Sequence, residues 1–250
     1  MAEQLTDSTD AGTTKDRVAP LLRNARRRLL ELDSMLQGAY GAPEAALGNK
    51  RSPLNEAVYI LLSYQTNLRK SKLVWRQLRS CFPRWEDVER APVTRVAAVL
   101  RQGGLHRQKA RVIKALLAKV RNAFGELSLE ALREESDERA ERILTQLPGL
   151  SWKGARCVLL YSLDRDVFPV DVNTFRILKR IGIIGADSVY RRRSLHDRLQ
   201  EAIPPLRRRQ FHVNLVIHGQ RTCLPLNPKC TACVVRPICN MTGLRASIEC

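Results

Sequence analysis

Apolar residues recur at intervals of three and four along most of the chain, which is the spacing of one face of an α-helix. Glycines at Gly103-Gly104, Gly125, Gly149 and Gly182 indicate helix ends or turns between these segments. Clean alternation of apolar and polar residues never extends beyond a few positions, so no strand is predicted. The sequence predicts an all-α protein. Its expected helices are residues 18–36, 56–66, 72–82, 93–102, 107–125, 131–147, 155–163, 172–182, 194–203 and 207–220.

The length and charge of the chain narrow its class. With 250 residues it can form one large domain or two small lobes with a real core. No run of about 18 apolar residues exists, so we expect no membrane span. Lys and Arg number 43 against 25 Asp and Glu, which gives a net charge of +18. Such a charge attracts polyanions. Nucleic acid is the expected partner, and an anionic membrane surface is the alternative. Charge alone does not exclude the interpretation that the chain is a soluble basic protein without such a partner.

The N-terminal residues 1–16 are polar, include acids and offer little to bury. They match neither a signal peptide nor an Arg-rich transit peptide, and we expect a disordered tail. The expected location is the cytoplasm, associated with the nucleoid if the source is bacterial. In a reducing compartment the seven cysteines are expected to lack structural disulfides.

Four cysteines fall in the tail segment CLPLNPKCTACVVRPIC, with the spacing C-x6-C-x2-C-x5-C. Four thiolates within 17 residues can converge on one metal centre. Zinc sites often use two CxxC-like pairs, and this segment has one; the uneven spacing suits a [4Fe–4S] cluster, with a zinc ribbon as the alternative. Cys81 and Cys157 lie in apolar helical segments and are expected in the core. The predicted metal ligands are Cys223, Cys230, Cys233 and Cys239.

The segment LPGLSWKG, from Leu147 to Gly154, combines a turn with a lysine at the start of an apolar helical run. Its glycine-containing turn suits a helix–hairpin–helix, which can direct backbone N–H groups at one phosphate without reading base identity. An ordinary turn between two helices is the alternative. Lys153 could be a surface charge, a phosphate clamp or a nucleophile. Asp171 follows it by eighteen residues and could serve as a helix N-cap, a catalytic carboxylate or both.

The chain resembles the endonuclease III family of helix–hairpin–helix DNA glycosylases in three segments. In chain order these are LPGLSWKGA, VDVNTFR, and HGQRTC with the three cysteines that follow it. The resemblance extends over roughly Asn55 to Cys239. It implies a monomer of two α-helical lobes with a DNA-binding cleft between them, no contact with membranes, and duplex DNA containing a damaged or modified base as the partner. It also implies a [4Fe–4S] cofactor. The implied bounds are 50–165 for the lobe with the hairpin, 17–49 with 166–222 for the second lobe, and 223–239 for the cluster motif.

The resemblance also assigns roles. Lys153 matches the family's nucleophile, which attacks C1′ of the sugar and gives a Schiff base before β-elimination nicks the strand. Asp171 matches the carboxylate that stabilises the oxocarbenium character of C1′. Gln65 matches the glutamine that fills the gap left by an extruded base, although a buried polar helix residue is an equal alternative. The expected DNA contacts are Gln65, Leu147, Gly149, Ser151 and Lys229.

Substrate and chemistry remain open between several interpretations. The implied activity is a glycosylase with AP lyase activity for oxidised or 5-modified pyrimidines. The segment FPVD-x-N, with Asn173, also looks like the plant 5-methylcytosine glycosylases. A monofunctional glycosylase for mispaired adenine or alkylated purines is a second alternative, and a non-catalytic DNA-binding iron–sulfur protein is a third. Ser151 departs from the family's second hairpin glycine, which would add strain if that position required a positive φ.

Overall fold

The computed structural model describes residues 12–41 and 47–241, with only the helical backbone given for residues 12–23. The described chain is all-α, as predicted, and no strand occurs within these ranges. None of the described helices is both long enough and apolar enough to cross a membrane. The α-helices are α1 (Gly12–Tyr40), α2 (Pro53–Ser63), α3 (Leu68–Cys81), α4 (Trp85–Arg90), α5 (Val93–Val99), α6 (His106–Phe124), α7 (Asp137–Thr145), α8 (Trp152–Ser162), α9 (Val172–Ile181), α10 (Arg193–Ala202) and α11 (Arg208–Arg221). Short 3-10 helices are η1 (Arg101–Gly103), η2 (Glu130–Glu134), η3 (Pro205–Arg207), η4 (Cys230–Ala232) and η5 (Arg236–Ile238).

These elements form two compact units. The central unit comprises the described parts of Ala42–Val172 together with Pro205–Val213. The terminal unit comprises the described parts of Met1–Gly41, Asn173–Pro204 and Asn214–Cys250. Each unit therefore combines segments that are distant in the sequence.

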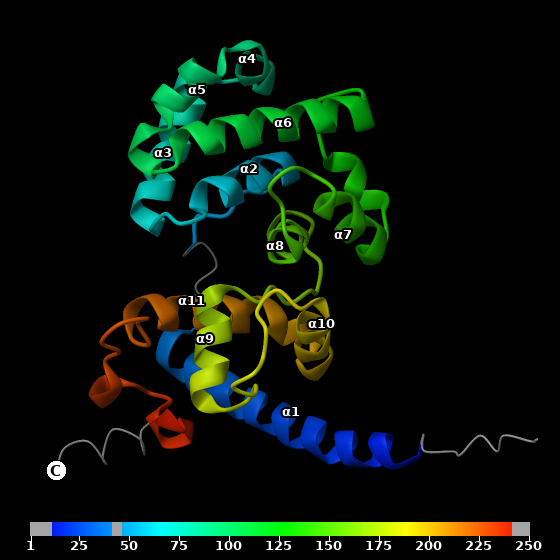
Figure 1. Cartoon of the computed structure of the whole chain (residues 1–250), viewed down its shortest axis with the longest axis vertical. Coiled ribbons are helices and arrows are strands. Elements are labelled where there is room, and N and C mark those ends of the chain that lie inside the picture. Colours follow the sequence, from blue (N-terminus) through cyan, green and yellow to red (C-terminus); the bar gives the residue numbers. More distant parts are fainter. Residues whose placement is uncertain (1–11, 42–46, 242–250) are drawn as a thin grey trace, which may run out of the picture. The chain divides into compact units, whose positions relative to one another are not determined.

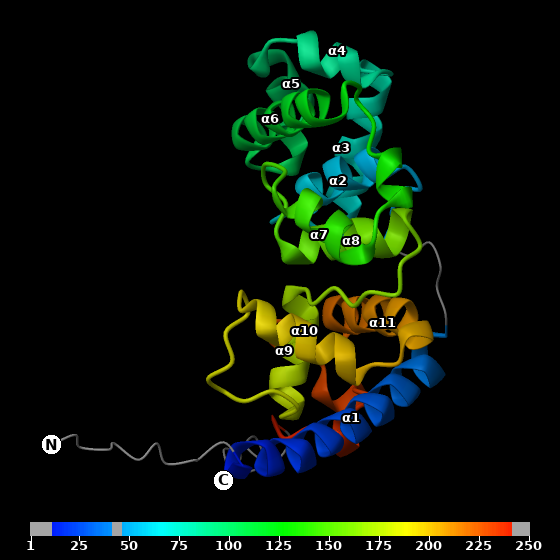
Figure 2. The same ribbon diagram turned by 90° about the vertical axis from the view of Figure 1, so that its right-hand side faces the viewer.

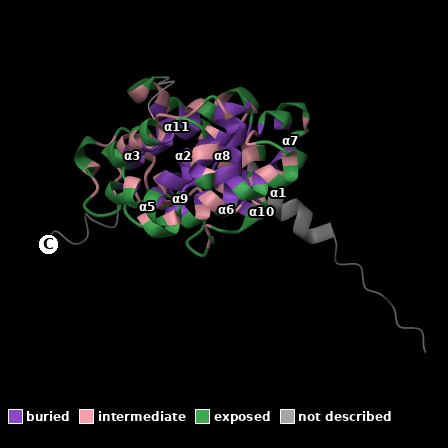
Figure 3. Cartoon of the chain, turned by 90° about the horizontal axis from the view of Figure 1, so that it is seen from above, coloured by how far each residue is buried: buried purple, intermediate pink, exposed green. Residues whose placement is uncertain are grey.

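In the central unit, α6 lies alongside α2 and α5, and α8 packs against both α2 and α7 (Figure 1). The helices α2 and α8 are largely buried, as their colouring in Figure 3 shows. Val58, Leu62, Leu116 and Val158 are all at most 1% exposed. Burying each such side chain contributes roughly 1.5–3 kcal/mol to folding. The packed pair α2–α8 is thus a rigid base for any side chain that it carries.

In the terminal unit, α1 packs against α10 (Figure 2). Leu29, Leu32 and Leu36 recur at helical spacing on α1 and are buried. Arg28 of the same helix donates hydrogen bonds to the carbonyl oxygens of Ile181 (2.5 Å) and Gly182 (2.9 Å). A cation at the C-terminal end of a helix satisfies its unpaired carbonyl groups. Arg28 therefore fixes the end of α9 to α1.

The structure differs from the predicted helices at several places: α4 was not predicted, and the helix expected at 93–102 is divided into α5 and η1. The helix expected at 56–66 ends at Ser63, because Tyr64 has an extended backbone with ψ 128° and Gln65 follows in the left-handed region with φ 52°. The helix expected at 131–147 is divided into η2 and α7, because Ser136 caps α7 by accepting a hydrogen bond from the Arg139 N–H. Cys81, expected in the core, is exposed at the end of α3.

The N-terminal and interlobe bounds also differ from the sequence expectation. Most of the predicted tail, residues 1–11, lies outside the described residues, and α1 already begins at Gly12. Segments 166–172 and 205–213, expected in the second lobe, belong to the central unit. Phe168 stacks on Phe211 with ring centroids 5.7 Å apart, which joins the two segments, and the rings of Tyr161 in α8 and His212 lie 6.0 Å apart, which joins them to the central unit. Arg209 Nη2 also pairs with Asp164 Oδ1 at 2.6 Å.

Candidate active site

The turn between α7 and α8 is tightly specified. Gly149 has φ 81°, and a Cβ there would lie 2.5 Å from Cγ1 of Val112, so both conformation and space require glycine. The Leu150 N–H donates to the Leu147 carbonyl oxygen at 3.2 Å, and both leucines are buried. Gly149 and Ser151 are exposed, and within the described ranges their backbone N–H groups have no acceptor. These two N–H groups can bind an anion, whereas Leu147 anchors the turn.

Ser151 is the N-cap of α8. Its backbone is extended, with φ −92°, and its hydroxyl accepts from the Gly154 N–H at 3.5 Å. The strain considered for a serine at this hairpin position therefore does not arise. An N-cap followed closely by a lysine places positive charge at the positive end of a helix, which favours an anionic ligand in front of the turn.

Lys153 is the second residue of α8 and is half-buried. Its ammonium nitrogen lies 5.9 Å from the centre of the Tyr64 ring, and its charge lowers the pKa of Cys157 one turn further along α8. Its charge also lowers the pKa of Glu56, a buried acid of α2. Lys153 is thus directed along the wall formed by α2 and α8 and is not a freely solvated surface charge.

Glu56 is fully buried near this lysine. Its two carboxylate oxygens accept hydrogen bonds of 2.6 Å from the Asn49 side chain and from the Lys50 backbone N–H. Burial raises the pKa of Glu56 to about 7, although those hydrogen bonds and the positive charges of Lys153 and Lys50 pull it down. The carboxyl group can therefore exchange a proton near neutral pH.

Asp171 directly precedes α9, is buried to 8% exposure, and belongs to the same unit as Lys153. Both residues act on the buried imidazole of His212: the charge of Asp171 raises its pKa and that of Lys153 lowers it. Burial is the largest cause and brings the pKa of His212 to about 4, so the ring is neutral at pH 7. His212 also hydrogen-bonds the Pro169 backbone and packs edge-on to Phe168. The segment that carries Asp171 is thereby held against the start of α11.

Gln65 lies exposed in the turn between α2 and α3, with its backbone in the left-handed region. A second turn beside it, between η1 and α6, carries Leu105 in a similar state, with φ 48° and 48% exposure. Thr66 Oγ1 donates to the Gly103 carbonyl oxygen at 2.6 Å and so links the two turns. A left-handed backbone in a non-glycine residue is strained and often marks a functional position. The structure excludes the buried helical alternative for Gln65.

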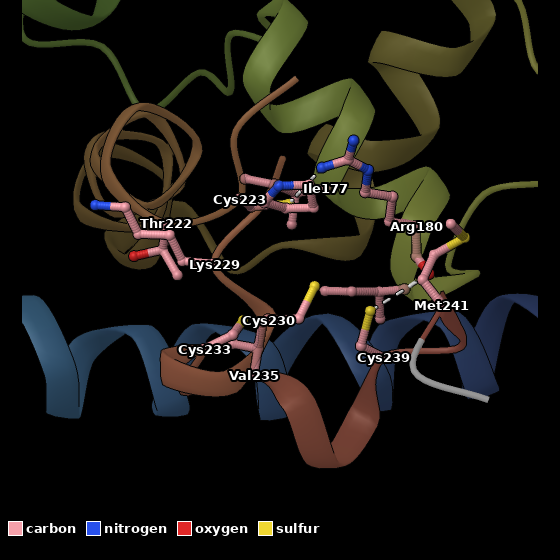
Figure 4. Close-up of a pocket in the computed structure, with 12 residues that line it drawn as sticks. Ile177, Arg180, Thr222, Cys223, Lys229, Cys230, Cys233, Val235, Cys239 and Met241 are labelled. Carbon is pink, nitrogen blue, oxygen red and sulfur yellow. Dashed lines mark hydrogen bonds between the residues drawn. The ribbon is translucent and has the colours of Figure 1, made fainter. Parts of the chain in front are cut away.

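All four cysteines of the predicted metal site line one pocket of about 50 Å³ in the terminal unit (Figure 4). Arg180 of α9 donates a hydrogen bond to Cys223 Sγ at 3.3 Å, and His218 Nε2 lies 3.6 Å from Cys233 Sγ. Lys229 also lines the pocket and is exposed. The six cysteines within the described ranges are all free of disulfide bonds.

The four cysteine thiols of this pocket are suited to binding a positively charged metal centre. Burial raises the pKa of Cys233 and of Cys239, and the neighbouring cysteines raise both further. A bound cation would stabilise the thiolates that the apolar wall and mutual repulsion disfavour. Among the described His, Cys, Asp and Glu side chains, no three are arranged to hold a single metal ion. Four cysteine thiolates on one pocket are the ligand set of a [4Fe–4S] cluster.

Comparison with known proteins identifies the family. Residues 58–205 match the HhH-GPD superfamily of base excision DNA repair proteins. A candidate DNA glycosylase of Arabidopsis thaliana is 31% identical over 228 residues, which covers 88% of this chain and 76% of that protein. The chain therefore belongs to the HhH-GPD superfamily, and it is a DNA glycosylase of the endonuclease III type.

Two further comparisons refine this assignment. The structure of a non-covalent endonuclease III–DNA complex superposes with a TM-score of 0.75 at 22% identity, over 89% of this chain and 98% of that one. The similarity confirms the endonuclease III fold. The DNA glycosylase/AP lyase ROS1 of Arabidopsis thaliana is 28% identical over 172 residues. That match covers 62% of this chain but only 12% of ROS1, so the chain spans a small part of that relative.

Several residues of the site carry no sequence motif. In the sequence, Glu56 is one more polar residue in an apolar helix, and His212 belongs to no motif. Leu105 follows two glycines directly, and this Gly-Gly-Leu sequence is the one signal that could have marked a strained apolar turn. The structure shows these residues because it places α2, α8 and the start of α11 within one unit.

Proposed function

We propose that this DNA glycosylase removes an oxidised or otherwise 5-modified pyrimidine from duplex DNA and then cleaves the strand by β-elimination. Lys153 is the nucleophile and Asp171 the catalytic carboxylate. The observation that carries the proposal is that both charges act on the same buried groups, His212 and Cys157, within one unit. An amine and a carboxylate at one site are what attack on C1′ requires.

The chain's own groups supply each step. The exposed N–H groups of Gly149 and Ser151, at the start of α8, bind a backbone phosphate and position the strand. Gln65 enters the duplex where the target base leaves the stack. Asp171 stabilises the positive charge that develops on the sugar as the base departs. The free amine of Lys153 forms the Schiff base, and loss of a C2′ proton then expels the 3′ phosphate.

Cofactor binding is a separate part of the proposal. Cys223, Cys230, Cys233 and Cys239 would hold a [4Fe–4S] cluster, with Arg180 donating a hydrogen bond to one ligand sulfur. The cluster, when bound, crosslinks the 223–239 segment and can exchange one electron. Lys229 lines the same pocket and would direct its charge toward DNA.

Borohydride trapping with the variant Lys153→Ala tests the nucleophile. The parent should form a covalent adduct with duplexes containing an abasic site, and the variant should form none while binding the same DNA within about threefold. Lys119→Ala, on the exposed side of α6, is the control and should trap like the parent. Base release without any adduct would replace the lyase with a monofunctional glycosylase. If the parent binds DNA but releases no base from any substrate, the chain would be a non-catalytic DNA-binding protein.

The identity of the excised base is a second question, and one observation favours a specific answer. The FPVD-x-N segment, which looks like that of the plant 5-methylcytosine glycosylases, favours a 5-substituted cytosine over a ring-oxidised pyrimidine. Base excision is measured on four kinds of duplex to decide between these substrates. The duplexes contain thymine glycol, 5-hydroxymethyluracil, 5-methylcytosine or an alkylated purine. The substrate whose kcat/KM is highest identifies the base, and a preference for the alkylated purine would contradict the pyrimidine assignment.

A further inference from the structure

The most unusual lysine outside the catalytic pair is Lys109 of α6. It is 6% exposed, and no acid accepts from its ammonium group in any of its hydrogen bonds. Those bonds go to the carbonyl oxygens of Leu62 (2.8 Å) and Gly103 (3.1 Å) and to Thr66 Oγ1 (2.6 Å). Burying an ammonium group is costly unless all of its protons find acceptors, and here all three do.

The three acceptors belong to two different turns. Leu62 lies in the last turn of α2 and Thr66 in the turn that follows, whereas Gly103 ends η1. Lys109 therefore binds both turns at once, and the bond from Thr66 to Gly103 closes the same network. A lysine that caps the carbonyl ends of two helices also interacts favourably with both dipoles.

Each of these turns presents one exposed residue with a left-handed backbone. Gln65 lies between Thr66 and the end of α2, and Leu105 lies two residues after Gly103. Leu105 is 48% exposed, and a strained backbone conformation at an exposed apolar residue indicates a functional position. An apolar side chain and an amide, presented together, suit the gap and the unpaired partner base that an extruded nucleotide leaves.

From this network we infer that Lys109 is a positioning residue for base extrusion: it locks the two turns together so that Gln65 and Leu105 enter the duplex as one unit. The inference rests on the proposed function, since it concerns the step that delivers the base to Lys153 and Asp171. It adds a residue that touches neither the DNA nor the reacting atoms.

The chain offers a matched control on the same helix. Lys114 also donates to three backbone carbonyls, those of Val88, Glu89 and Ala91, but they lie at the end of α4, where no residue has a positive φ. Lys109→Met and Lys114→Met each replace an ammonium group by an apolar group of similar length. Only the first removes the link between the two turns.

The first test measures kinetics with the full chain. Lys109→Met should lower kcat/KM for base excision from duplex DNA by about ten- to hundredfold, because small misplacements of a positioned group have effects of that size. Cleavage of a single-stranded abasic oligonucleotide, which needs no extrusion, should change by less than about twofold. Equal losses on both substrates, or the same duplex loss in Lys114→Met, would overturn the inference.

The second test needs no catalysis. A duplex carries 2-aminopurine beside a tetrahydrofuran abasic analogue, and entry of the two side chains into the stack changes its fluorescence. The parent and Lys114→Met should give the full change at saturating protein, and Lys109→Met less than about half of it. If Lys109→Met does not fold, Thr66→Val, which keeps the lysine but removes the hydroxyl link, must show the same loss. Parental fluorescence in the folded variant overturns the inference, whereas a parent inactive on every substrate overturns only the proposed function.

Discussion

At the scale of single residues, the site places ionisable side chains of opposite charge in a part of the protein that is largely shielded from water. Lys153, Glu56 and Asp171 lie in one unit, with Cys157, Tyr161 and His212 buried among them. Burial raises the pKa of Cys157 to about 11, so its thiol stays protonated beside the lysine and does not compete as a nucleophile. The pKa of Tyr161 is raised well above its ordinary value for the same reason. The proposed nucleophile, Lys153, therefore has no competing thiolate beside it.

Glu56 gives a pH-dependent prediction for stability. Because burial raises its pKa from 4.5 to about 7, the unfolded chain ionises first as the pH rises through this window. The free energy of unfolding of the parent should thus fall between pH 4.5 and 7 relative to that of Glu56→Gln. The fall should be about 3 kcal/mol, because each tenfold difference between the two ionisation constants corresponds to about 1.4 kcal/mol.

Urea unfolding of both proteins at several pH values measures this difference. His212 titrates in the same window with the opposite sign, but it is present in both proteins and cancels in the comparison. Glu138→Gln, on the exposed surface of α7, is the control and should leave the pH dependence of the parent unchanged. A constant difference between parent and Glu56→Gln across the window would contradict the assignment of a buried, proton-binding carboxyl group.

At the scale of elements, the hairpin depends on how α7 and α8 are fixed. A buried ion pair joins them, with 2.6 Å between Arg156 Nε and Glu141 Oε1. The two side chains are 3% and 9% exposed, so removing one partner would leave the other unpaired in the interior. This pair ties α7 to α8 and so helps to fix the shape of the turn between them.

Gly149→Ala tests that shape. An alanine there must adopt a left-handed backbone and place its Cβ 2.5 Å from Val112 and 2.8 Å from Leu61. The two effects together should lower the free energy of unfolding by about 2–4 kcal/mol. Gly125→Ala is the matched control: Gly125 has φ 77° but no heavy atom within 4 Å of the added Cβ. It should cost only about 1 kcal/mol, and equal losses in the two variants would show that the hairpin glycine is not constrained by packing.

At the scale of the whole molecule, the net charge of +18 sets how binding responds to salt. Cations that neutralise phosphates release counterions, so log affinity should fall linearly with log salt. We expect the affinity for undamaged duplex DNA to fall at least about a hundredfold between roughly 50 and 200 mM salt. Fluorescence anisotropy across that range measures the slope, and a flat dependence would show that the basic residues do not contact phosphate.

The proposed cluster would depend on the whole terminal unit, since the pocket of the four cysteines uses residues of α9 and of the C-terminal segment. Anaerobically purified protein should contain about four irons and four sulfides per chain. Cys230→Ser should lose most of that iron, whereas Cys81→Ser, at an exposed cysteine outside the pocket, should keep it. Zinc in place of iron and sulfide would contradict the assignment.

The sequence by itself determined the all-α class, the four-cysteine motif, and the lysine and aspartate that carry the family resemblance. These features are local. Helical periodicity, a Pro-Gly turn and closely spaced cysteines each involve residues that are near one another in the sequence, so they can be recognised without the structure. Its helix ends were less accurate, because a cap at Ser136 and a left-handed Gln65 depend on single backbone conformations.

Only the tertiary structure decided what surrounds those residues. Glu56, His212 and Lys109 look like ordinary polar positions in the sequence, and each becomes significant because packing removes water from it and brings distant charges or carbonyl groups near. Desolvation and long-range contact arise from the folded arrangement of α2, α6, α8 and α11, and no pattern of neighbouring residues encodes them. The motifs thus carry the family resemblance, while the packing of the helices sets the protonation and position of the groups proposed to act.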